Sequence, residues 1–299
     1  MASVRAIIVC LAVIISILIV VTLYNHFGIP HFLQCMGGTT LSFVAHEDDD
    51  LLFLNPDIAK SISAGKCTIT VFVTAGDAGV DASYWKNREL GSKAAYAALA
   101  KLPNEWIGSK LNINSFEIYS YELSSNRRVK LIFMRLPDGN IDGSGFPSNN
   151  FESLQKMWEG KIAKIYSVDT KQAYTYNDIV QVLTYFMTFY KPDRVYTEDY
   201  LGKYGDLDHS DHHSVAYFVK KADQNYHKKH LLVGFMGYRS AGLSANLDKS
   251  DIEIKEMVFI NYAKHDPYVC QTIDECNASG ISMFFAREYL VDQGTSLSD

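Results

Sequence analysis

Two clusters of histidines and carboxylates in this sequence have residue types and a spacing that suit a metal ion. The first is the run AHEDDD at residues 45–50, which directly follows an apolar, β-branched stretch. Neighbouring carboxylates repel one another and raise each other's pKa, so a positive ion that shares the space would stabilise them. The second is DHSDHH at residues 208–213, which offers imidazoles that could complete the coordination. Together the clusters predict a shared divalent metal ion.

His46 and Asp49 are three residues apart in a tight turn, so both side chains can point at one ion. The third ligand could be any of three histidines in the second cluster: His209, His212 or His213. Three nitrogen or oxygen ligands with an open position are typical of a catalytic zinc ion, whereas structural zinc sites have four protein ligands. Such an ion lowers the pKa of its water and polarises a carbonyl. This pattern favours a metal-dependent hydrolase.

Two further side chains could move protons in such a reaction. Asp48 precedes the predicted ligand and could act as the general base. A histidine that does not bind the ion, such as His209, could stabilise the oxyanion or protonate the leaving nitrogen. Each cluster alone also has a simpler explanation: AHEDDD as a solvated acidic turn or a calcium site, and HSDHH as a polar helix start. Neither explanation accounts for both clusters following apolar strands.

The elements around the first cluster predict a βαβ unit. Residues 39–45 and 68–74 are β-branched apolar runs that predict buried strands. Between them, the run NPD at residues 55–57 predicts a helix start, with a cap, a proline at the first position and an acid in the first turn. Gly65 predicts the end of that helix. Strand, helix and strand in this order indicate a parallel sheet.

The rest of the chain continues the alternation of strands and helices. Helices are predicted over residues 84–100, 151–164, 177–190, 214–226 and 251–264, and strands over residues 116–122, 129–135, 193–197 and 231–235. The predicted fold class is α/β, a Rossmann-like, mostly parallel sheet flanked by helices and preceded by an N-terminal hydrophobic helix. Open parallel sheets carry functional groups at the carboxyl ends of their strands, and both clusters occupy that position.

Composition excludes some partners. The chain is 47% hydrophobic, which is enough for a sizeable core. Its formal net charge is -6, and there is no dense stripe of lysine and arginine. Since binding to a phosphate backbone depends on such positive charge, we expect no nucleic-acid partner.

The N-terminus contains an uncharged apolar run at residues 6–23. Its length is near the lower limit of about 20 residues for spanning a bilayer. We predict that residues 1–27 form an uncleaved single-pass membrane anchor, in the endoplasmic reticulum or the secretory pathway. Arg5 before the run would keep the N-terminus in the cytosol and the catalytic domain lumenal or extracellular. The alternative is a cleaved signal segment and a secreted protein.

Cysteines and a sequon agree with an oxidising compartment. Four cysteines lie outside the apolar run: Cys35, Cys67, Cys270 and Cys276. Cys270 and Cys276 could close a short loop, although four reduced thiols are the alternative. The tripeptide Asn277-Ala278-Ser279 is a glycosylation sequon.

Several motifs resemble those of the PIG-L/LmbE-like family of zinc-dependent N-deacetylases. AHEDDD resembles the family signature AHPDDE, and HSDHH resembles its later HxDH motif. TAGDAG at residues 74–79, YWKNRE at residues 84–89 and RLPDG at residues 135–139 extend the resemblance. It covers most of residues 39–217, and we assign the deacetylase domain to residues 37–292.

The resemblance implies a role for six residues. It implies three zinc ligands: His46, Asp49 and His212. It also implies Asp48 as the general base, His209 as the imidazole that assists the reaction, and Arg88 as a contact to the polar substrate. An alternative for Arg88 is a surface helix position paired with Glu89 or with an acid one turn away.

The chain departs from the family pattern at three positions. Glu47 replaces the usual proline and Asp50 the usual glutamate, and the sequence leaves open whether they surround the site or face solvent. Leu207 occupies the position where some members have a tyrosine that assists the oxyanion, so that role is vacant or filled from elsewhere, for example by Tyr204.

The resemblance implies an amidase that removes acetyl from an N-acetylglucosaminyl substrate. With the predicted anchor, a lipid-linked substrate such as N-acetylglucosaminyl-phosphatidylinositol, and a role in membrane-anchor biosynthesis at the endoplasmic reticulum, are expected. That role would place the catalytic domain in the cytosol, so the sequence leaves the membrane topology open. The alternatives are a secreted deacetylase of other glycans or polysaccharide, and a non-catalytic carbohydrate-binding relative.

Overall fold

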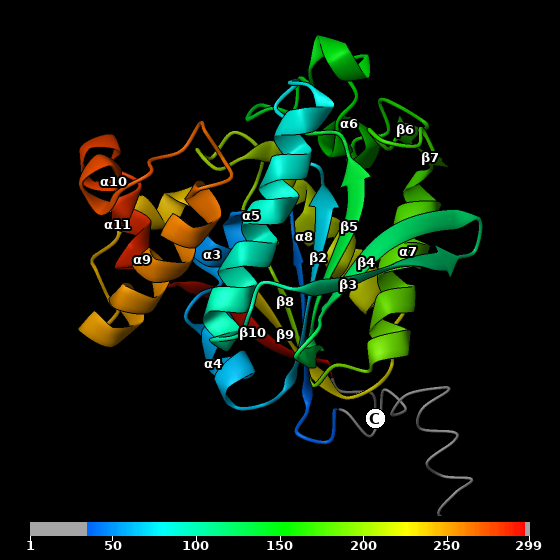
Figure 1. The fold of residues 1–299 in the computed structure, drawn as a ribbon. Coiled ribbons are helices and arrows are strands. Elements are labelled where there is room, and N and C mark those ends of the chain that lie inside the picture. Colours follow the sequence, from blue (N-terminus) through cyan, green and yellow to red (C-terminus); the bar gives the residue numbers. More distant parts are fainter. Residues whose placement is uncertain (1–34, 297–299) are drawn as a thin grey trace, which may run out of the picture. The chain divides into compact units, whose positions relative to one another are not determined.

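An eight-stranded sheet forms the centre of the protein (Figure 1). The computed structural model describes residues 35–296, and the compact unit with the two clusters begins at Gly37. The strand order is β10-β9-β8-β1-β2-β5-β4-β3. The strands are β1 (Thr39–Val44), β2 (Cys67–Thr74), β3 (Trp106–Ile113), β4 (Phe116–Leu123), β5 (Asn126–Leu136), β8 (Arg194–Thr197), β9 (His230–Phe235) and β10 (Leu290–Ser296). The central five are parallel, whereas β3, β4 and β10 pair antiparallel, so the predicted mostly parallel sheet is confirmed.

Helices cover both faces of this sheet. The longer ones are α5 (Ala82–Ala100), α7 (Tyr176–Tyr190), α8 (Ser210–Asp223) and α9 (Lys249–Ala263). The shorter ones are α3 (Asp49–Phe53), α4 (Asp57–Ser63), α6 (Leu154–Trp158), α10 (Ile273–Ser279) and α11 (Ser282–Phe285). In Figure 1, α5 and α9 lie in front of the strands and α8 lies behind them. A two-stranded sheet of β6 (Ile165–Tyr166) and β7 (Ala173–Tyr174) lies outside these layers.

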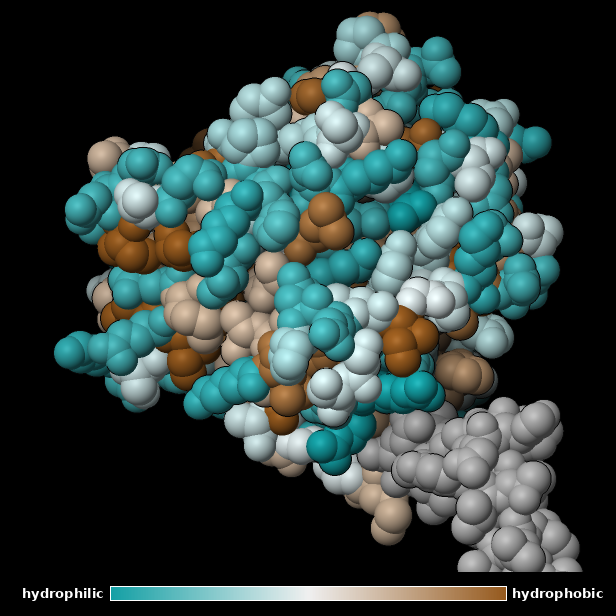
Figure 2. Space-filling view, viewed as in Figure 1, coloured by the Kyte–Doolittle hydropathy of each residue, from teal (hydrophilic) through white to brown (hydrophobic). Residues whose placement is uncertain are grey.

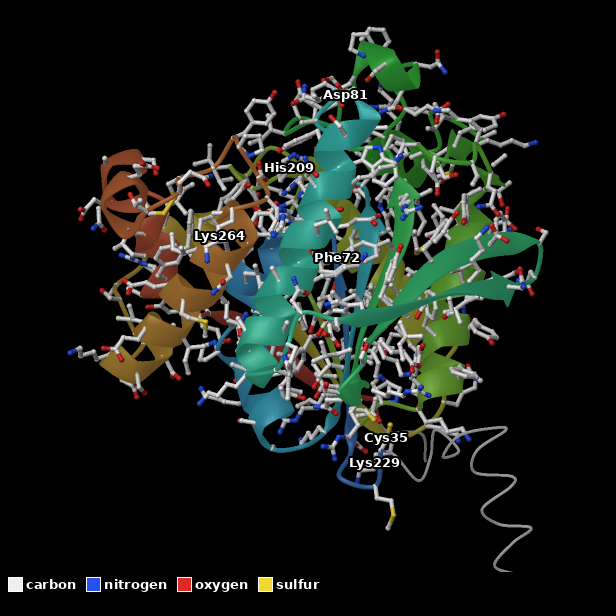
Figure 3. All side chains as sticks on the ribbon, in the orientation of Figure 1. Cys35, Phe72, Asp81, His209, Lys229 and Lys264 are labelled. Carbon is white, nitrogen blue, oxygen red and sulfur yellow. A yellow bond between two sulfur atoms is a disulfide. The ribbon has the colours of Figure 1, made fainter. Side chains whose placement is uncertain are left out.

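The central strands form because their side chains are buried on both faces. Every residue of β1 and β2 is buried, which explains their nearly continuous apolar, β-branched sequences. Phe72 of β2 stacks on Phe133 of β5 with ring centroids 5.0 Å apart, beneath α5 (Figure 3). On the face shown in Figure 2, apolar residues occur in small groups among hydrophilic ones. The apolar residues of the central strands thus form the interior.

Parallel pairing places the two clusters at the same end of the sheet. β8 is the parallel neighbour of β1, with Tyr196 opposite Ser42. The first cluster follows β1 directly, and the second follows β8 after a short loop and begins α8. Figure 3 shows His209 at the end toward which the parallel strands run, whereas Lys229 lies at the opposite end. The predicted position at the carboxyl ends of the strands is confirmed.

Other elements differ from the sequence prediction. The helix predicted over residues 151–164 is only the five-residue α6, and Gly160, with φ 72°, follows it closely. β3 was not predicted, because most of its residues are exposed and its sequence WIGSKLNI has no apolar alternation. It exists because it pairs along its whole length with β4. β10 was not predicted either, and it depends on pairing with β9.

The structure does not support the predicted single-pass membrane anchor, and this prediction is corrected. Within residues 35–296, no helix is long and apolar enough to cross a membrane. The apolar run at residues 6–23, on which the anchor and the N-terminal hydrophobic helix were predicted, lies outside the described residues.

Cys270 and Cys276 form a disulfide, as one of the two sequence alternatives anticipated. The bond joins Cys270, in the segment before α10, to Cys276 within α10, and Cys276 is fully buried. Because Cys276 belongs to the main apolar core, the bond attaches this peripheral segment to the interior.

Lys93 of α5 is a buried lysine whose pKa makes the stability of the protein depend on pH. Its ammonium group is buried and lies 3.3 Å from the ring centroid of Tyr121 in β4. Burial lowers the pKa of Lys93 from 10.5 to about 8, and Glu89 opposes this shift only in part. Between those values the unfolded lysine binds a proton that the folded one does not, so Lys93 makes the free energy of unfolding rise with pH.

We expect Lys93→Met to abolish this rise between about pH 8 and 10.5. The variant should also be more stable at neutral pH by up to about 2 kcal/mol, because methionine has no charge to desolvate. Urea unfolding across this pH range measures both effects. Lys220→Met is the control, since Lys220 also lies over a tyrosine ring, that of Tyr200. A rise that persists in Lys93→Met would contradict the prediction.

Candidate active site

The carboxylate of Asp49 joins the two clusters. His46 follows β1, Asp49 begins α3 and His212 lies in the first turn of α8. Asp49 Oδ2 lies 3.0 Å from His46 Nδ1, and Asp49 Oδ1 lies 3.0 Å from His212 Nε2. All three side chains are buried. The structure therefore brings together the three residues that the sequence suggested as metal ligands.

The electrostatics of this group favour positive charge between the side chains. Burial raises the pKa of Asp49, but His212 and His46 outweigh this effect and hold that pKa well below its ordinary value. Burial lowers the pKa of each histidine, yet nearby carboxylates, chiefly Asp49, raise the pKa of both well above the ordinary value. Positive charge at these nitrogens, as protons or as a metal ion, is thus stabilised.

His212 is arranged as metal-binding histidines usually are. Its Nδ1 lies 2.8 Å from Asp208 Oδ1, which also accepts the backbone N–H of Tyr238 at 3.1 Å. A carboxylate at Nδ1 keeps the proton there and leaves the lone pair on Nε2. The buried Nε2 faces Asp49 Oδ1 at 3.0 Å, a contact at ion-pair distance that lacks hydrogen-bond geometry. A divalent ion beside Asp49 would occupy this position, so the residues fit a metal.

His209 lies beside the group as a neutral imidazole. Its ring centroid is 4.6 Å from that of His46, and its Nδ1 accepts the backbone N–H of Asp211 at 3.1 Å. Burial, with the positive histidines nearby, lowers the pKa of His209 well below its ordinary value. Since Nδ1 accepts a hydrogen bond, the single proton of the neutral ring is on Nε2. Nε2 points toward Asp138, 3.8 Å away, and is available as a donor.

His213 does not belong to the metal-binding group. Its Nδ1 lies 2.9 Å from the backbone oxygen of Asp199, and its Nε2 lies 2.9 Å from Asp206 Oδ1. Nitrogens of three histidines, by contrast, lie within 4.8 Å of one another: His46, His209 and His212. Of the three histidines left open as the third ligand, geometry therefore excludes His213.

Asp48 is held by Arg88. Arg88 Nη2 lies 2.5 Å from Asp48 Oδ1, so the other carboxylate oxygen of Asp48 remains for chemistry. Burial raises the pKa of Asp48, and Arg88 counteracts part of that shift. A carboxylate whose pKa moves toward neutrality is better suited to act as a general base.

Arg88 is buried rather than exposed on the helix surface. Its Nε donates to the hydroxyl of Tyr262 at 2.6 Å, and its Nη1 donates to the oxygen of Gly76 at 2.7 Å. Its Nε also lies 3.2 Å from Asp266 Oδ2. The alternative pairing with Glu89 is wrong, because Glu89 binds Arg135 at 2.6 and 3.0 Å.

The two departures from the family signature, Glu47 and Asp50, are both fully buried. Glu47 Oε2 lies 3.6 Å from Arg88 Nη1, and Asp50 Oδ2 accepts the hydroxyl of Tyr96 at 2.5 Å. Burial raises the pKa of each carboxyl group well above its ordinary value. Neither residue faces solvent, which answers the question that the sequence left open.

Three residues near the group were not selected from the sequence: Asp138, Glu198 and Tyr238. Asp138 lies within reach of His46 and His209. Glu198 directly follows β8, and its position at the end of a buried strand was a signal that could have identified it. The ring of Tyr238 lies 5.0 Å from that of His212, whereas nothing in the sequence marked this tyrosine.

Tyr204 does not fill the position left by Leu207. Its hydroxyl hydrogen-bonds with Ser214 Oγ at 2.9 Å, and its ring packs against His213 and Tyr217. Leu207 itself is 87% exposed. The suggestion that Tyr204 assists the oxyanion therefore has no support in the structure.

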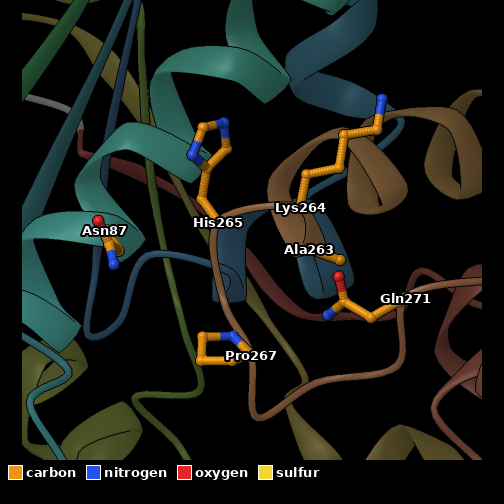
Figure 4. Close-up of a pocket in the computed structure, with 6 residues that line it drawn as sticks. All are labelled: Asn87, Ala263, Lys264, His265, Pro267 and Gln271. Atoms are coloured by element: carbon orange, nitrogen blue, oxygen red, sulfur yellow. The ribbon is translucent and has the colours of Figure 1, made fainter.

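A separate cavity of about 520 Å³ lies where α5 meets the segment after α9 (Figure 4). It is lined by Asn87, Ala263, Lys264, His265, Pro267 and Gln271. None of these six residues belongs to the histidine and carboxylate group. Two lining residues adjoin residues that contact each other near the site, because Asn87 precedes Arg88 and His265 precedes Asp266.

The chain is similar to several solved structures at low sequence identity. N,N'-diacetylchitobiose deacetylase from Pyrococcus horikoshii is 13% identical, with 86% of this chain and 83% of that chain covered and a TM-score of 0.47. The hydratase GalB from Pseudomonas putida is 13% identical, with 88% and 97% covered and a TM-score of 0.43. A deacetylase of teicoplanin biosynthesis is 13% identical, with 75% and 84% covered and a TM-score of 0.42. Likenesses this distant do not distinguish one activity from another.

The family comparison is more specific. No curated protein matches the chain. The family model PIG-L, described as GlcNAc-PI de-N-acetylase, matches residues 41–222, which is more than half of the sequence and includes both clusters. The chain therefore belongs to the PIG-L family.

Proposed function

We propose that this protein is a zinc-dependent N-deacetylase that hydrolyses the acetamido group of an N-acetylglucosaminyl substrate. The observation that carries the proposal is the position of Asp49 between His46 and His212, with Asp48 beside it. Membership of the PIG-L family supports an N-deacetylase, and the buried histidine and carboxylate group supports a metal ion.

Three residues would hold the ion: His46, Asp49 and His212. When bound, a zinc ion polarises the amide carbonyl and lowers the pKa of a water molecule. Asp208 would keep the proton of His212 on Nδ1, and thereby present Nε2 to the metal. Two neutral imidazoles and one carboxylate also match the open zinc sites of hydrolases.

Asp48 would accept the proton of the attacking water. Arg88 occupies its Oδ1, so the proton would go to Oδ2. His209 would donate its Nε2 proton in a hydrogen bond to the developing oxyanion. The carbon–nitrogen bond would then break as Asp48 passes the proton it accepted to the leaving nitrogen, and the acyl carbon with the water oxygen would leave as acetic acid, which ionises to acetate.

Arg88 would bind the sugar through an N–H of Nη2. Its contacts to Asp48, Gly76 and Tyr262 leave two N–H groups: one of Nη1, which lies 3.6 Å from Glu47, and one of Nη2, which would bind a substrate hydroxyl. We propose N-acetylglucosamine as the sugar because the family model describes GlcNAc-PI de-N-acetylase. Acetate release from free N-acetylglucosamine, from its phosphatidylinositol conjugate and from chitin oligosaccharides would identify the substrate. Binding without acetate release would indicate a carbohydrate-binding relative instead.

One pair of variants distinguishes the proposed general base from the proposed metal ligands. Asp48→Asn should lower kcat by about 10²- to 10⁴-fold, because the water loses its proton acceptor. The variant should keep its metal, measured by elemental analysis of the purified protein. His212→Ala should lose both metal and activity.

Asp248→Asn is the matched control, since Asp248 is an exposed cap of α9 and should change neither quantity. Undiminished turnover in Asp48→Asn would remove Asp48 from its proposed role. Unchanged metal content in His212→Ala would remove His212 from the ligand set.

A further prediction concerns the charge balance around Arg88. Arg88→Met should lower the free energy of unfolding by about 3–5 kcal/mol, because the buried carboxyl groups of Glu47 and Asp266 and the partly buried Asp48 lose their cation. Arg88→Lys keeps the charge but loses the planar fork, so it should lose less stability while kcat/KM still falls. Denaturant unfolding and steady-state kinetics measure these effects. Equal stability of Arg88→Met and wild type would contradict this account of the site.

A further inference from the structure

Glu198 lies at the same end of the sheet as the proposed metal ligands. It directly follows Thr197, the last residue of β8, which is the parallel neighbour of β1. The backbone N–H of Ala45 donates to Glu198 Oε1 at 2.7 Å. Ala45 immediately precedes His46, so the hydrogen bond holds the Glu198 carboxylate next to the first cluster.

The second oxygen of this carboxylate has no protein partner. Glu198 is fully buried, and among the described residues Oε2 has no hydrogen-bond partner. A carboxylate oxygen of Glu198 lies in one group with ligand atoms of Asp49 and His212, all within 4.8 Å of one another. A buried carboxylate beside another carboxylate is costly unless a cation lies between them.

The arginines at this end of the sheet are engaged elsewhere. Arg88 pairs with acids of the first cluster and with Asp266. Arg239 pairs with Asp199 at 3.2 Å and with Asp206 at 2.8 Å. Neither guanidinium group has a recorded contact with Glu198. The position beside Glu198, Asp49 and His212 is therefore best suited to an ion that the protein does not itself provide.

We propose that Glu198 is a fourth protein ligand of the metal ion, in addition to His46, Asp49 and His212. The inference rests on the proposed metal-binding function and deepens it. Two carboxylates neutralise a divalent ion more completely than one, so Glu198 increases affinity. It also shifts the metal preference of the site toward ions such as Mn²⁺, because carboxylate ligands suit Mn²⁺ better than imidazole ligands do. Zinc can expand to five ligands, which leaves a position for water or substrate.

Metal affinity and metal preference test this proposal without reference to catalysis. The full-length protein is stripped with a chelator and titrated with Zn²⁺, Mn²⁺ and Co²⁺ against a competing indicator. Glu198→Gln should weaken Zn²⁺ binding by about 10- to 100-fold or more. It should weaken Mn²⁺ binding still more, and it should change the visible spectrum of bound Co²⁺, which depends on the ligand set.

Asp50→Asn is the matched control for removing a buried carboxylate. Asp50 lies in the same turn and is fully buried, but it binds the hydroxyl of Tyr96 and lies outside the metal-binding group. It should keep the affinities and the Co²⁺ spectrum of the wild type. Glu198→Asp is a second variant, which can be measured if Glu198→Gln does not fold. Its shorter side chain should give a smaller rise in Tm on Zn²⁺ addition than the wild type.

The outcomes separate the two proposals. If Glu198→Gln binds all three ions as the wild type does, with the same Co²⁺ spectrum, Glu198 is a buried structural acid and the inference is overturned alone. If the wild type binds none of the ions, the proposed metal site fails and the inference fails with it. Where the glutamine variant does not fold, an equal Tm rise in Glu198→Asp and wild type overturns the inference.

Discussion

The site depends on the contacts of the Asp49 carboxylate with two histidines. Its two oxygens contact His46 from the first cluster and His212 from the second, so one carboxylate connects segments that are far apart in the chain. The backbone N–H of His46 also donates to Asp49 Oδ2 at 2.6 Å, which orients the side chain before any ligand binds.

Buried negative charge around Asp49 is balanced on two sides in different ways. On one side, Arg88 neutralises Asp48, Glu47 and Asp266, and Tyr262 supports it by accepting its Nε–H. On the other side, Asp49 and Glu198 have histidines but no arginine or lysine among their recorded contacts. Because carboxylates repel when they are desolvated, a cation would stabilise this second side. This asymmetry is why we propose metal binding on the side of Asp49 and proton transfer at Asp48.

The sheet makes this arrangement possible. Parallel pairing of β1 with β8 places the ends of both strands side by side, and the clusters follow those ends. The edge strand β3 was not predictable from local sequence, because most of its residues are exposed and it has no apolar alternation, and β10 depends on its pairing with β9. The central strands were predictable, because burial on both faces demands continuous apolar, β-branched sequences.

The sequence by itself determined the buried strands, the α/β class and the residue types of the two clusters. Local spacing was sufficient to pair His46 with Asp49, since three residues in a tight turn cannot separate far. Only the tertiary structure decided which distant residues join them. It turned both nitrogens of His213 toward Asp199 and Asp206, and it buried Arg88 against Asp48. It also brought Glu198 to the group, because contacts between distant segments depend on strand register and burial, which local spacing does not encode.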